Sequence, residues 1–124
     1  RDGANVFAAP GNAGTASESK NLPIEATDSA ALLDAVKQHE IDLVVVGPEA
    51  PLFEGLVDKL TEAGVRAFGP SALAAQLEGS KIFCKELLHT NDITTATYRQ
   101  FNSLDKARSF LESREDEPVV VKAD

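Results

Sequence analysis

Short apolar runs alternate along this chain with longer segments in which apolar residues recur every three or four positions. A short apolar run predicts a strand, and the longer period predicts a helix with one apolar face. Strands are predicted in this way at Asn5–Ala9, Ile24–Ala26, Ile41–Val46, Val65–Phe68, Tyr98–Phe101 and Pro118–Ala123. Strands and helices that alternate through short loops predict an α/β fold with a parallel sheet built from βα units.

The predicted helices carry signals at their ends. Asp28 can cap a helix that ends near His39, because its carboxylate can accept a bond from a free backbone N–H group. Leucines at four-residue steps mark a second helix from Leu52 to Leu60, and Gly64 is placed to end it in a left-handed conformation. Further helices are predicted over Ser71–Leu77 and after caps at Ser80 and Ser103.

The valine-rich run Ile41–Val46 leads directly into Gly47, Pro48 and Glu49. So apolar a run predicts a strand buried on both faces of a parallel sheet. Glu49 then lies in the turn between the carboxyl end of that strand and the next helix, which is where open α/β sheets bind ligands. Glu49 is therefore either a substrate contact or a carboxylate that only complements the dipole of the following helix.

A second polar turn, Pro10–Thr15, follows the first predicted strand. Its two glycines let the backbone bend tightly and approach a ligand closely. Asn12 and Thr15 add side-chain polar groups to the exposed N–H groups of the loop, and this combination suits an anion. A plain turn between two elements is the alternative interpretation.

Two lysines occupy unusual positions. Lys81 lies in the first turn of a predicted helix, where the dipole disfavours a cation. A bound phosphate would offset that cost, and an ordinary solvated lysine is the alternative. Lys122 ends an apolar predicted strand, and burial of an ammonium group is costly. Either its stem lies along the sheet with its charge in water, or it points into a charged ligand site.

The composition of the chain narrows its function. Of its 124 residues, 43% are hydrophobic and 26% are charged, which is typical of a soluble globular protein. The formal net charge of −8 disfavours nucleic acid and anionic membranes as partners. Cys84 is the only cysteine, so no intrachain disulfide can form. A chain with a single cysteine fits a reducing cytoplasm. We interpret Cys84 itself as a buried thiol in the core. No apolar stretch approaches the ~20 residues of a membrane span.

Four separated segments resemble one family in order and spacing, across essentially the whole chain. They are Pro10-Gly11-Asn12-Ala13-Gly14-Thr15-Ala16, Gly47-Pro48-Glu49-Ala50-Pro51-Leu52, Gln76-Leu77-Glu78-Gly79-Ser80-Lys81 and Val119-Val120-Val121-Lys122-Ala123-Asp124. The family is glycinamide ribonucleotide synthetase, also called phosphoribosylamine–glycine ligase, an ATP-grasp family of purine biosynthesis. The resemblance implies a Rossmann-like pre-ATP-grasp domain over residues 1–79 and the beginning of an ATP-grasp region over residues 80–124.

The resemblance also implies an activity. In this family ATP phosphorylates the carboxylate of glycine, and the amine of 5-phosphoribosylamine attacks the resulting glycyl phosphate. The products are glycinamide ribonucleotide, ADP and phosphate. The substrates expected for the parent enzyme are therefore 5-phosphoribosylamine, glycine and ATP, with Mg²⁺ or Mn²⁺ as the cofactor and the cytoplasm as its location.

Site roles follow from the same resemblance. Asn12, Gly14 and Thr15 are expected to face the ribose phosphate of phosphoribosylamine. Gly47, Pro48 and Glu49 are expected at its ribosyl or amine end. Lys81 and Lys122 match the two lysines that ATP-grasp folds direct at nucleotide phosphates. No catalytic residue and no metal ligand is assigned within the chain, and the metal ligands are expected beyond Asp124.

Family members also have a first strand and a glycine-rich loop that would precede Arg1, and a glycine-rich phosphate flap that would follow Asp124. We therefore expect the chain to be a fragment that needs the remainder of its parent chain and does not turn over substrate alone. The alternative is a non-catalytic phosphate- or nucleotide-binding module that reuses the same half-domain.

Overall fold

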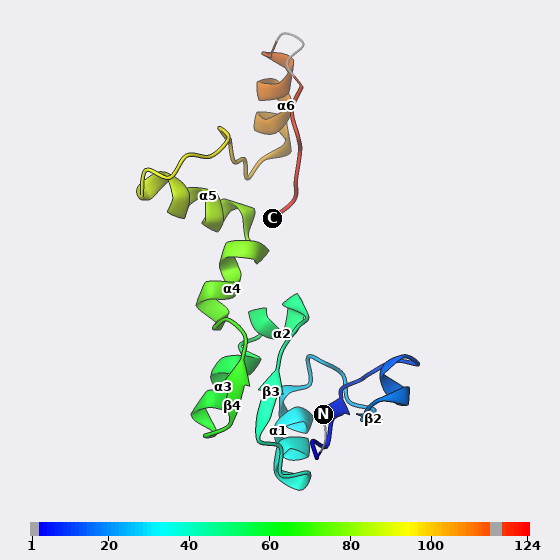
Figure 1. Ribbon diagram of the computed structural model, residues 1–124. Helices are drawn as coiled ribbons and strands as arrows, with labels where there is room; N and C mark the ends of the chain where they lie inside the picture. The colour runs from blue at the N-terminus through cyan, green and yellow to red at the C-terminus, as the bar shows by residue number, and fades with distance from the viewer. Residues whose placement is uncertain (1–2, 115–117) are drawn as a thin grey trace. The chain divides into compact units, whose positions relative to one another are not determined.

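A computed structural model describes residues 3–114 and 118–124 of the chain. The chain divides into two compact units, Arg1–Ala75 and Gln76–Asp124. Figure 1 labels most of the elements of both units along the chain. None of the helices in the described residues is long and apolar enough to cross a membrane. Each unit is described by itself below.

The strands of the first unit pair in parallel, as predicted. β1 (Phe7–Ala8) pairs with β2 (Lys20–Asn21), and β3 (Leu43–Val45) pairs with β4 (Arg66–Phe68). These pairs form two separate two-stranded sheets. The α/β class with parallel strands is therefore confirmed, and in the described residues the sheet is divided into two small parts.

The strand predicted at Ile24–Ala26 is wrong, because the pairing takes place just before it. Lys20 N–H donates to Val6 O at 2.9 Å, and Leu22 N–H donates to Ala8 O at 2.8 Å. The chain then turns at Pro23, and Ile24 N–H bonds locally to Leu22 O at 2.8 Å. The residues that join the ladder with β1 are therefore those before Pro23, and the apolar sequence at Ile24–Ala26 does not identify them.

The first helix, α1 (Ser29–Gln38), forms where it was predicted. Asp28 Oδ1 accepts a hydrogen bond from Ala31 N–H at 3.0 Å, and His39 follows the last helical residue. These contacts confirm the predicted cap and the predicted end of the helix. The side chain of Asp28 satisfies one of the free N–H groups with which every helix begins.

The second predicted helix is divided into α2 (Glu49–Phe53) and α3 (Leu56–Glu62). Gly55 lies between them with φ +74°, a left-handed conformation that interrupts the helix. Gly64 ends α3 with φ +78°, and Val65 N–H bonds Leu60 O at 2.9 Å. The Gly64 cap is therefore confirmed, whereas a single continuous helix is not.

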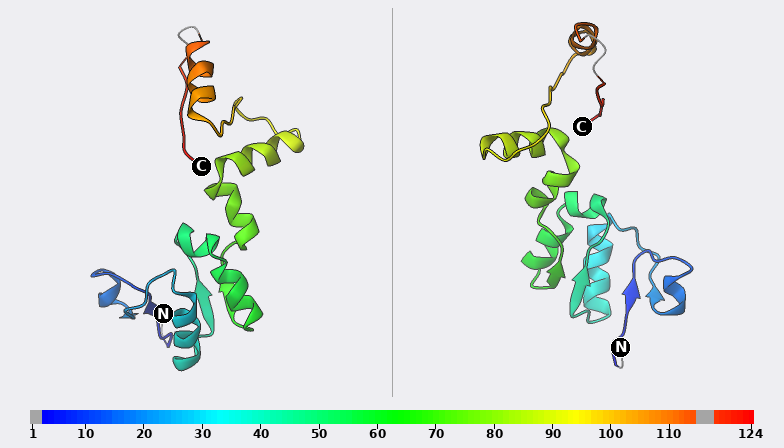
Figure 2. Two further views of the ribbon diagram at one scale, coloured as in Figure 1. Left: turned by 180° about the vertical axis from the view of Figure 1, so that it is seen from behind. Right: turned by 45° about the horizontal axis from the view of Figure 1, so that its top comes forward.

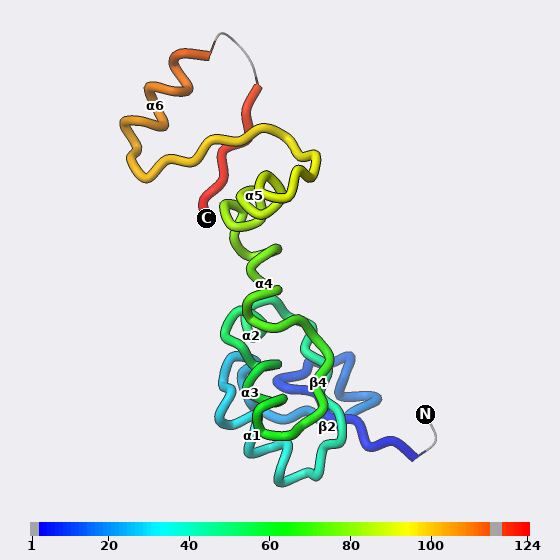
Figure 3. The backbone as a smooth tube through the Cα atoms, turned by 90° about the vertical axis from the view of Figure 1, so that its left-hand side faces the viewer, coloured from blue at the N-terminus to red at the C-terminus, as the bar shows by residue number. Residues whose placement is uncertain are grey.

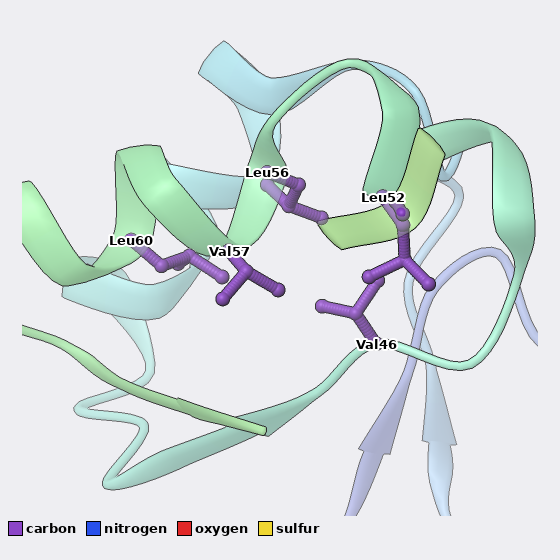
Figure 4. Packing of buried hydrophobic residues seen from close by; sticks show 6 residues of the cluster. Val46, Leu52, Leu56, Val57 and Leu60 are labelled. Carbon is purple, nitrogen blue, oxygen red and sulfur yellow. The ribbon is translucent and has the colours of Figure 1, made fainter. Parts of the chain in front are cut away.

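The core of the first unit lies where α2 and α3 pack against the end of β3. Its buried residues are Val46, Leu52, Leu56, Val57, Leu60 and Ala75, most of which Figure 4 labels. Leu60 is completely buried. Each buried valine or leucine contributes roughly 1.5–3 kcal/mol on burial, so this cluster is the main source of stability for the unit.

Only one face of β3 is covered in the described residues. Val44 and Val46 belong to the packed cluster, whereas 53% of Leu43 and 66% of Val45 remain exposed. Successive strand residues point to opposite faces, so the helical layer covers only the face that carries Val44 and Val46. Figure 2 shows the helices around this strand from two further directions. The prediction of burial on both faces is wrong here.

Helices dominate the second unit. α4 (Ala72–Gly79) enters it, and α5 (Lys81–Thr90) and α6 (Leu104–Glu112) follow. Ser80 Oγ accepts a hydrogen bond from Phe83 N–H at 3.0 Å, which confirms the predicted cap of α5. Cys84 is half-buried rather than buried.

The two strands predicted in this unit are wrong for the described residues. Neither Tyr98–Phe101 nor Pro118–Ala123 joins a ladder there, and 82% of Val120 and 76% of Val121 are exposed. Alternating or apolar sequence predicts a strand only when a neighbouring strand can accept its backbone bonds. The charged sequence Ser113–Glu117 predicts a turn just before the second of these segments, and this turn lies partly outside the described residues.

Candidate functional site

The loop after β1 is held together by its own side chains. Asn12 Oδ1 accepts hydrogen bonds from Gly14 N–H at 2.7 Å and from Thr15 N–H at 3.0 Å. Thr15 Oγ1 accepts the backbone N–H of Asn12 at 2.7 Å. The side-chain oxygen of Asn12 therefore occupies the concavity that the sequence suggested for an anion. In this conformation, Gly14 and Thr15 cannot offer their N–H groups to a ligand.

The bonds from the N–H groups of Gly14 and Thr15 to Asn12 Oδ1, called the Asn12 clamp below, determine which hydrogen-bond donors the loop still offers. The Asn12 amide is planar, so an oxygen directed at Gly14 and Thr15 leaves the Nδ2 group on the opposite side. Among the described hydrogen bonds, neither Asn12 Nδ2 nor Ala13 N–H has a protein acceptor. Because Asn12 and Ala13 are exposed, these two groups are available to an acceptor in solution.

One contributor to this loop was not found from the sequence. Asn21, a half-buried residue on β2, donates from Nδ2 to Asn12 O at 2.8 Å. Its Oδ1 accepts from Thr15 Oγ1 at 2.8 Å. An asparagine nine positions after Asn12 carries no sequence signal of this role, because the contact depends on the β1–β2 register that pairs Ala8 with Asn21.

The turn after β3 is open and exposed. Gly47 and Pro48 are exposed, and a Cβ atom built on Gly47 would meet no heavy atom within 4 Å. Pro48 is extended, with φ −71° and ψ 148°, and Glu49 is the first residue of α2. The exposed carboxylate of Glu49 thus lies in the first helical turn. None of the described hydrogen bonds joins this turn to the Asn12 loop.

In the second unit, Lys81 is the first residue of α5. Its Nζ group donates to the backbone carbonyl of Glu78, in the last turn of α4, at 2.9 Å. A cation at a helix C-terminus is favourable. The carbonyl of Glu78 therefore offsets the cost of placing Lys81 at the start of α5.

Asp124 caps the same helix from the other end of the second unit. Its Oδ2 accepts from Ser80 Oγ at 2.8 Å, and its Oδ1 accepts from Ile82 N–H at 3.1 Å and from Lys81 N–H. In Figure 3 the end of the chain lies beside the start of α5. The bond from Ser80, followed by that from Ile82 N–H, lowers the pKa of the Asp124 carboxyl below 3.8.

The capping contact also places Lys122. Lys122 is exposed and precedes Asp124 by two residues, so its Cα lies within about 7 Å of the Asp124 Cα. Because Asp124 bonds the first turn of α5, the chain segment of Lys122 is held close to the helix that begins at Lys81. The two predicted phosphate ligands are therefore brought to one region of the unit. The described residues contain no group of three or more His, Cys, Asp or Glu side chains that could hold a metal ion.

Parallel βα units that end in exposed polar turns define this chain as an α/β protein. Comparison with known families gives the assignment directly. Residues 1–78 match the N domain of phosphoribosylglycinamide synthetase, and residues 79–124 match the ATP-grasp (A) domain of the same enzyme. The chain belongs to the phosphoribosylglycinamide synthetase family, which confirms the resemblance seen in the four segments.

Individual relatives agree with this assignment. The chain is 54% identical over 125 residues to the phosphoribosylamine–glycine ligase of Rhodopirellula baltica, covering 97% of this chain and 29% of that protein. It is 50% identical over 121 residues to the enzyme of the same name from Escherichia coli K12, covering 96% of this chain and 28% of that protein. The chain thus spans less than a third of the length of these relatives.

Proposed function

We propose that the chain is the N-terminal part of a phosphoribosylamine–glycine ligase. The parent enzyme would join 5-phosphoribosylamine and glycine, with ATP converted to ADP and phosphate through a glycyl phosphate. The observation that supports this function is the unbroken succession of the family's N domain and ATP-grasp domain along the chain. The high identity to ligases across 97% of the chain supports it independently.

In this proposal the loop of Asn12, Gly14 and Thr15 binds the phosphate of phosphoribosylamine. The closed Asn12 clamp supports a specific version of that role. Asn12 Nδ2 and Ala13 N–H belong to exposed residues and have no described acceptor, so in this proposal they donate to a phosphate oxygen. Gly14 serves the clamp, because a Cβ atom there would lie 3.1 Å from Asn12 Oδ1.

Gly47, Pro48 and Glu49 then meet the ribosyl or amine end of the same substrate. Nothing in the described structure requires a glycine at position 47, since a Cβ atom would enter open space. A substrate that approaches the backbone closely would explain why position 47 is a glycine, which has no side chain to block it. Glu49, exposed at the end of the turn, can accept N–H bonds from the amine and orient it for attack.

Lys81 and Lys122 contact the phosphates of ATP in this proposal, and the boundary between the two domains lies between Gly79 and Ser80. The capping contact of Asp124 supports their convergence near the start of α5. Magnesium or manganese would reduce the charge repulsion of the nucleotide when bound. As the family resemblance implies, its ligands are proposed to lie in other parts of the parent chain. The substrates and the single cysteine suit a cytoplasmic enzyme.

An activity assay tests the proposal. The complete protein that carries this chain is incubated with phosphoribosylamine, glycine and ATP, and glycinamide ribonucleotide and ADP are measured together. We expect equal amounts of both products, and neither when glycine is omitted. A protein that binds ribose 5-phosphate or ATP by calorimetry but forms no product would instead be a non-catalytic binding module. A protein that binds neither ligand would contradict both functions.

A further inference from the structure

Asn21 uses both ends of its side-chain amide on the loop that follows β1. Nδ2 donates to the carbonyl of Asn12 at 2.8 Å, and Oδ1 accepts from the hydroxyl of Thr15 at 2.8 Å. The backbone of Asn21 is fixed separately, because β2 pairs in parallel with β1 and sets Asn21 opposite Ala8. A residue on a strand therefore supports the two residues, Asn12 and Thr15, that close the loop.

These contacts leave little freedom to Asn12. Its N–H donates to Thr15 Oγ1, its carbonyl accepts from Asn21, and its side-chain oxygen accepts from Gly14 and Thr15. The Thr15 hydroxyl has one proton, which can go to Asn21 Oδ1 at 2.8 Å or to Asn12 O at 3.0 Å. Asn21 gives that proton the shorter contact, and Asn12 O accepts from Asn21 Nδ2 at 2.8 Å and from Ala16 N–H at 3.0 Å. Nδ2 is then the polar group of Asn12 that has no described partner.

Gly11 shows how closely Asn21 fills its site. A Cβ atom on Gly11 would lie 2.4 Å from both Cγ and Oδ1 of Asn21, and Gly11 has φ +77°. The sequence suggested that the glycines of this loop admit a ligand. At position 11 the group that approaches is instead the amide of Asn21, so glycine is needed there for the support of the loop.

We infer that Asn21 is a positioning residue for the substrate phosphate. It does not contact the ligand, but it fixes the Asn12 backbone and the Thr15 hydroxyl, and through them it sets the direction of Asn12 Nδ2. This inference rests on the proposed function, because the phosphate of phosphoribosylamine is taken to bind that group. This role requires a side chain that carries a hydrogen-bond donor and an acceptor at a fixed spacing, as the amide of Asn21 does.

Two substitutions test this role in the complete protein. Asn21→Ala removes both contacts, whereas Asn21→Asp keeps an acceptor for Thr15 but turns a second oxygen toward Asn12 O. For both variants we expect KM for phosphoribosylamine to rise roughly 3- to 10-fold, the scale of one neutral hydrogen bond. KM for ATP and kcat at saturating substrate stay near wild type. Asn5→Ala, an exposed asparagine ahead of β1, is the matched control and changes neither KM.

Hydrogen exchange without substrate provides the second measurement. Peptides that contain Gly14 and Thr15 should exchange faster in Asn21→Ala than in wild type, because the clamp on their N–H groups loosens. Unchanged exchange would overturn the positioning role whatever the kinetics. Faster exchange with an unchanged KM for phosphoribosylamine would also overturn it, since the loop would then be ordered for another purpose. A wild-type protein without ligase activity would refute the proposed function, while the exchange comparison still decides whether Asn21 orders the loop.

Discussion

Asp124 and Ser80 are joined by a hydrogen bond of 2.8 Å between Oδ2 and Oγ, although 44 positions separate them in the sequence. Ser80 also accepts the N–H of Phe83, and Asp124 accepts the N–H groups of Lys81 and Ile82. Two side chains thus share the free N–H groups at the start of α5. This shared cap ties the chain segment of Lys122 to the helix of Lys81, so it links the two predicted ATP ligands.

The first prediction concerns the pH dependence of this cap. The folded-state pKa of Asp124 lies below its ordinary value of 3.8, so the cap is complete above that value and is lost as the pH falls through the folded-state pKa. Ser80→Ala removes the largest cause of the shift and should raise the pKa of Asp124 toward 3.8. An NMR titration of the Ile82 amide signal measures both values.

The matched control for this titration is Ser103→Ala. Ser103 precedes α6 in the same way that Ser80 precedes α5, but its side chain makes no capping bond. We expect the pKa of Asp124 to stay unchanged in this variant. An Asp124 pKa that does not move in Ser80→Ala would show that the hydroxyl of Ser80 does not stabilise the carboxylate.

The second prediction assigns the two lysines. In the complete ligase, Lys81→Ala and Lys122→Ala should each weaken ATP binding by roughly 10- to 150-fold, because a charge-assisted bond to phosphate contributes about 1.5–3 kcal/mol. The KM for phosphoribosylamine should change much less. Lys106→Ala, an exposed lysine of α6, is the control. Wild-type ATP affinity in both variants would make Lys81 and Lys122 ordinary solvated lysines.

The third prediction compares two glycines that follow neighbouring strands. At Gly69, with φ +153°, a Cβ atom would lie 2.9 Å from Val57 Cγ2 and 3.0 Å from Leu52 Cδ2. Gly69→Ala should therefore lower the free energy of unfolding by about 1–3 kcal/mol, as overpacked core substitutions do. Chemical denaturation measures this loss.

Gly47→Ala is the partner experiment. Its Cβ atom enters open space, so the substitution should leave stability unchanged or raise it by up to about 1 kcal/mol through the unfolded chain. If substrate approaches this backbone, KM for phosphoribosylamine should nevertheless rise. A Gly47→Ala enzyme with wild-type kinetics would place the ribosyl group elsewhere.

The fourth prediction separates the two roles of Asn12. In Asn12→Asp a carboxylate oxygen can still accept from the N–H groups of Gly14 and Thr15, so the loop should keep its conformation and the melting temperature should not fall. The outward amide becomes a negatively charged oxygen, which repels phosphate. We expect KM for phosphoribosylamine to rise roughly 10- to 150-fold, the scale of a lost charged hydrogen bond. A large loss of stability with normal KM would contradict this division of roles.

Local signals in the sequence identified the helices, whereas pairing partners determined the strands. The caps at Asp28 and Ser80 and the terminator at Gly64 depend on residues within a few positions, and all three are confirmed. The predicted cap at Ser103 is wrong, because the side chain of Ser103 makes no capping bond to α6. Strand pairing depends on distant residues. Pro118–Ala123 is apolar enough for a strand, yet it joins no ladder in the described residues.

The candidate site shows the same division. The sequence identified the Asn12 loop by residue type, but it could not show that Asn12 Oδ1 accepts the N–H groups of Gly14 and Thr15. The contributions of Asn21 and Asp124 were missed altogether. Both act over contacts that only the folded register creates, so no local pattern marks them.

The last prediction concerns Glu49, for which the sequence allowed two roles. The structure places it as the first residue of α2, exposed, after the extended residue Pro48. As a helix-end charge it would stabilise α2 by about 0.3–1 kcal/mol. As a substrate contact it would hold the amine of phosphoribosylamine within the near-attack distance of about 3–3.5 Å from the acyl phosphate.

Glu49→Gln keeps the size of the side chain and removes its charge, so the two roles predict opposite patterns. If Glu49 orients the amine, kcat/KM for phosphoribosylamine should fall roughly 10- to 100-fold, the scale of one charged hydrogen bond, with ATP affinity near wild type. The free energy of unfolding should then change by less than ~1 kcal/mol. If Glu49 only complements the helix dipole, a small loss of stability should accompany normal kinetics. Asp58→Asn is unsuitable as a control, because Asp58 Oδ2 caps Ala72 N–H at 2.7 Å. Glu62→Gln, an exposed residue at the end of α3, changes the same charge away from the turn and should leave kcat/KM unchanged.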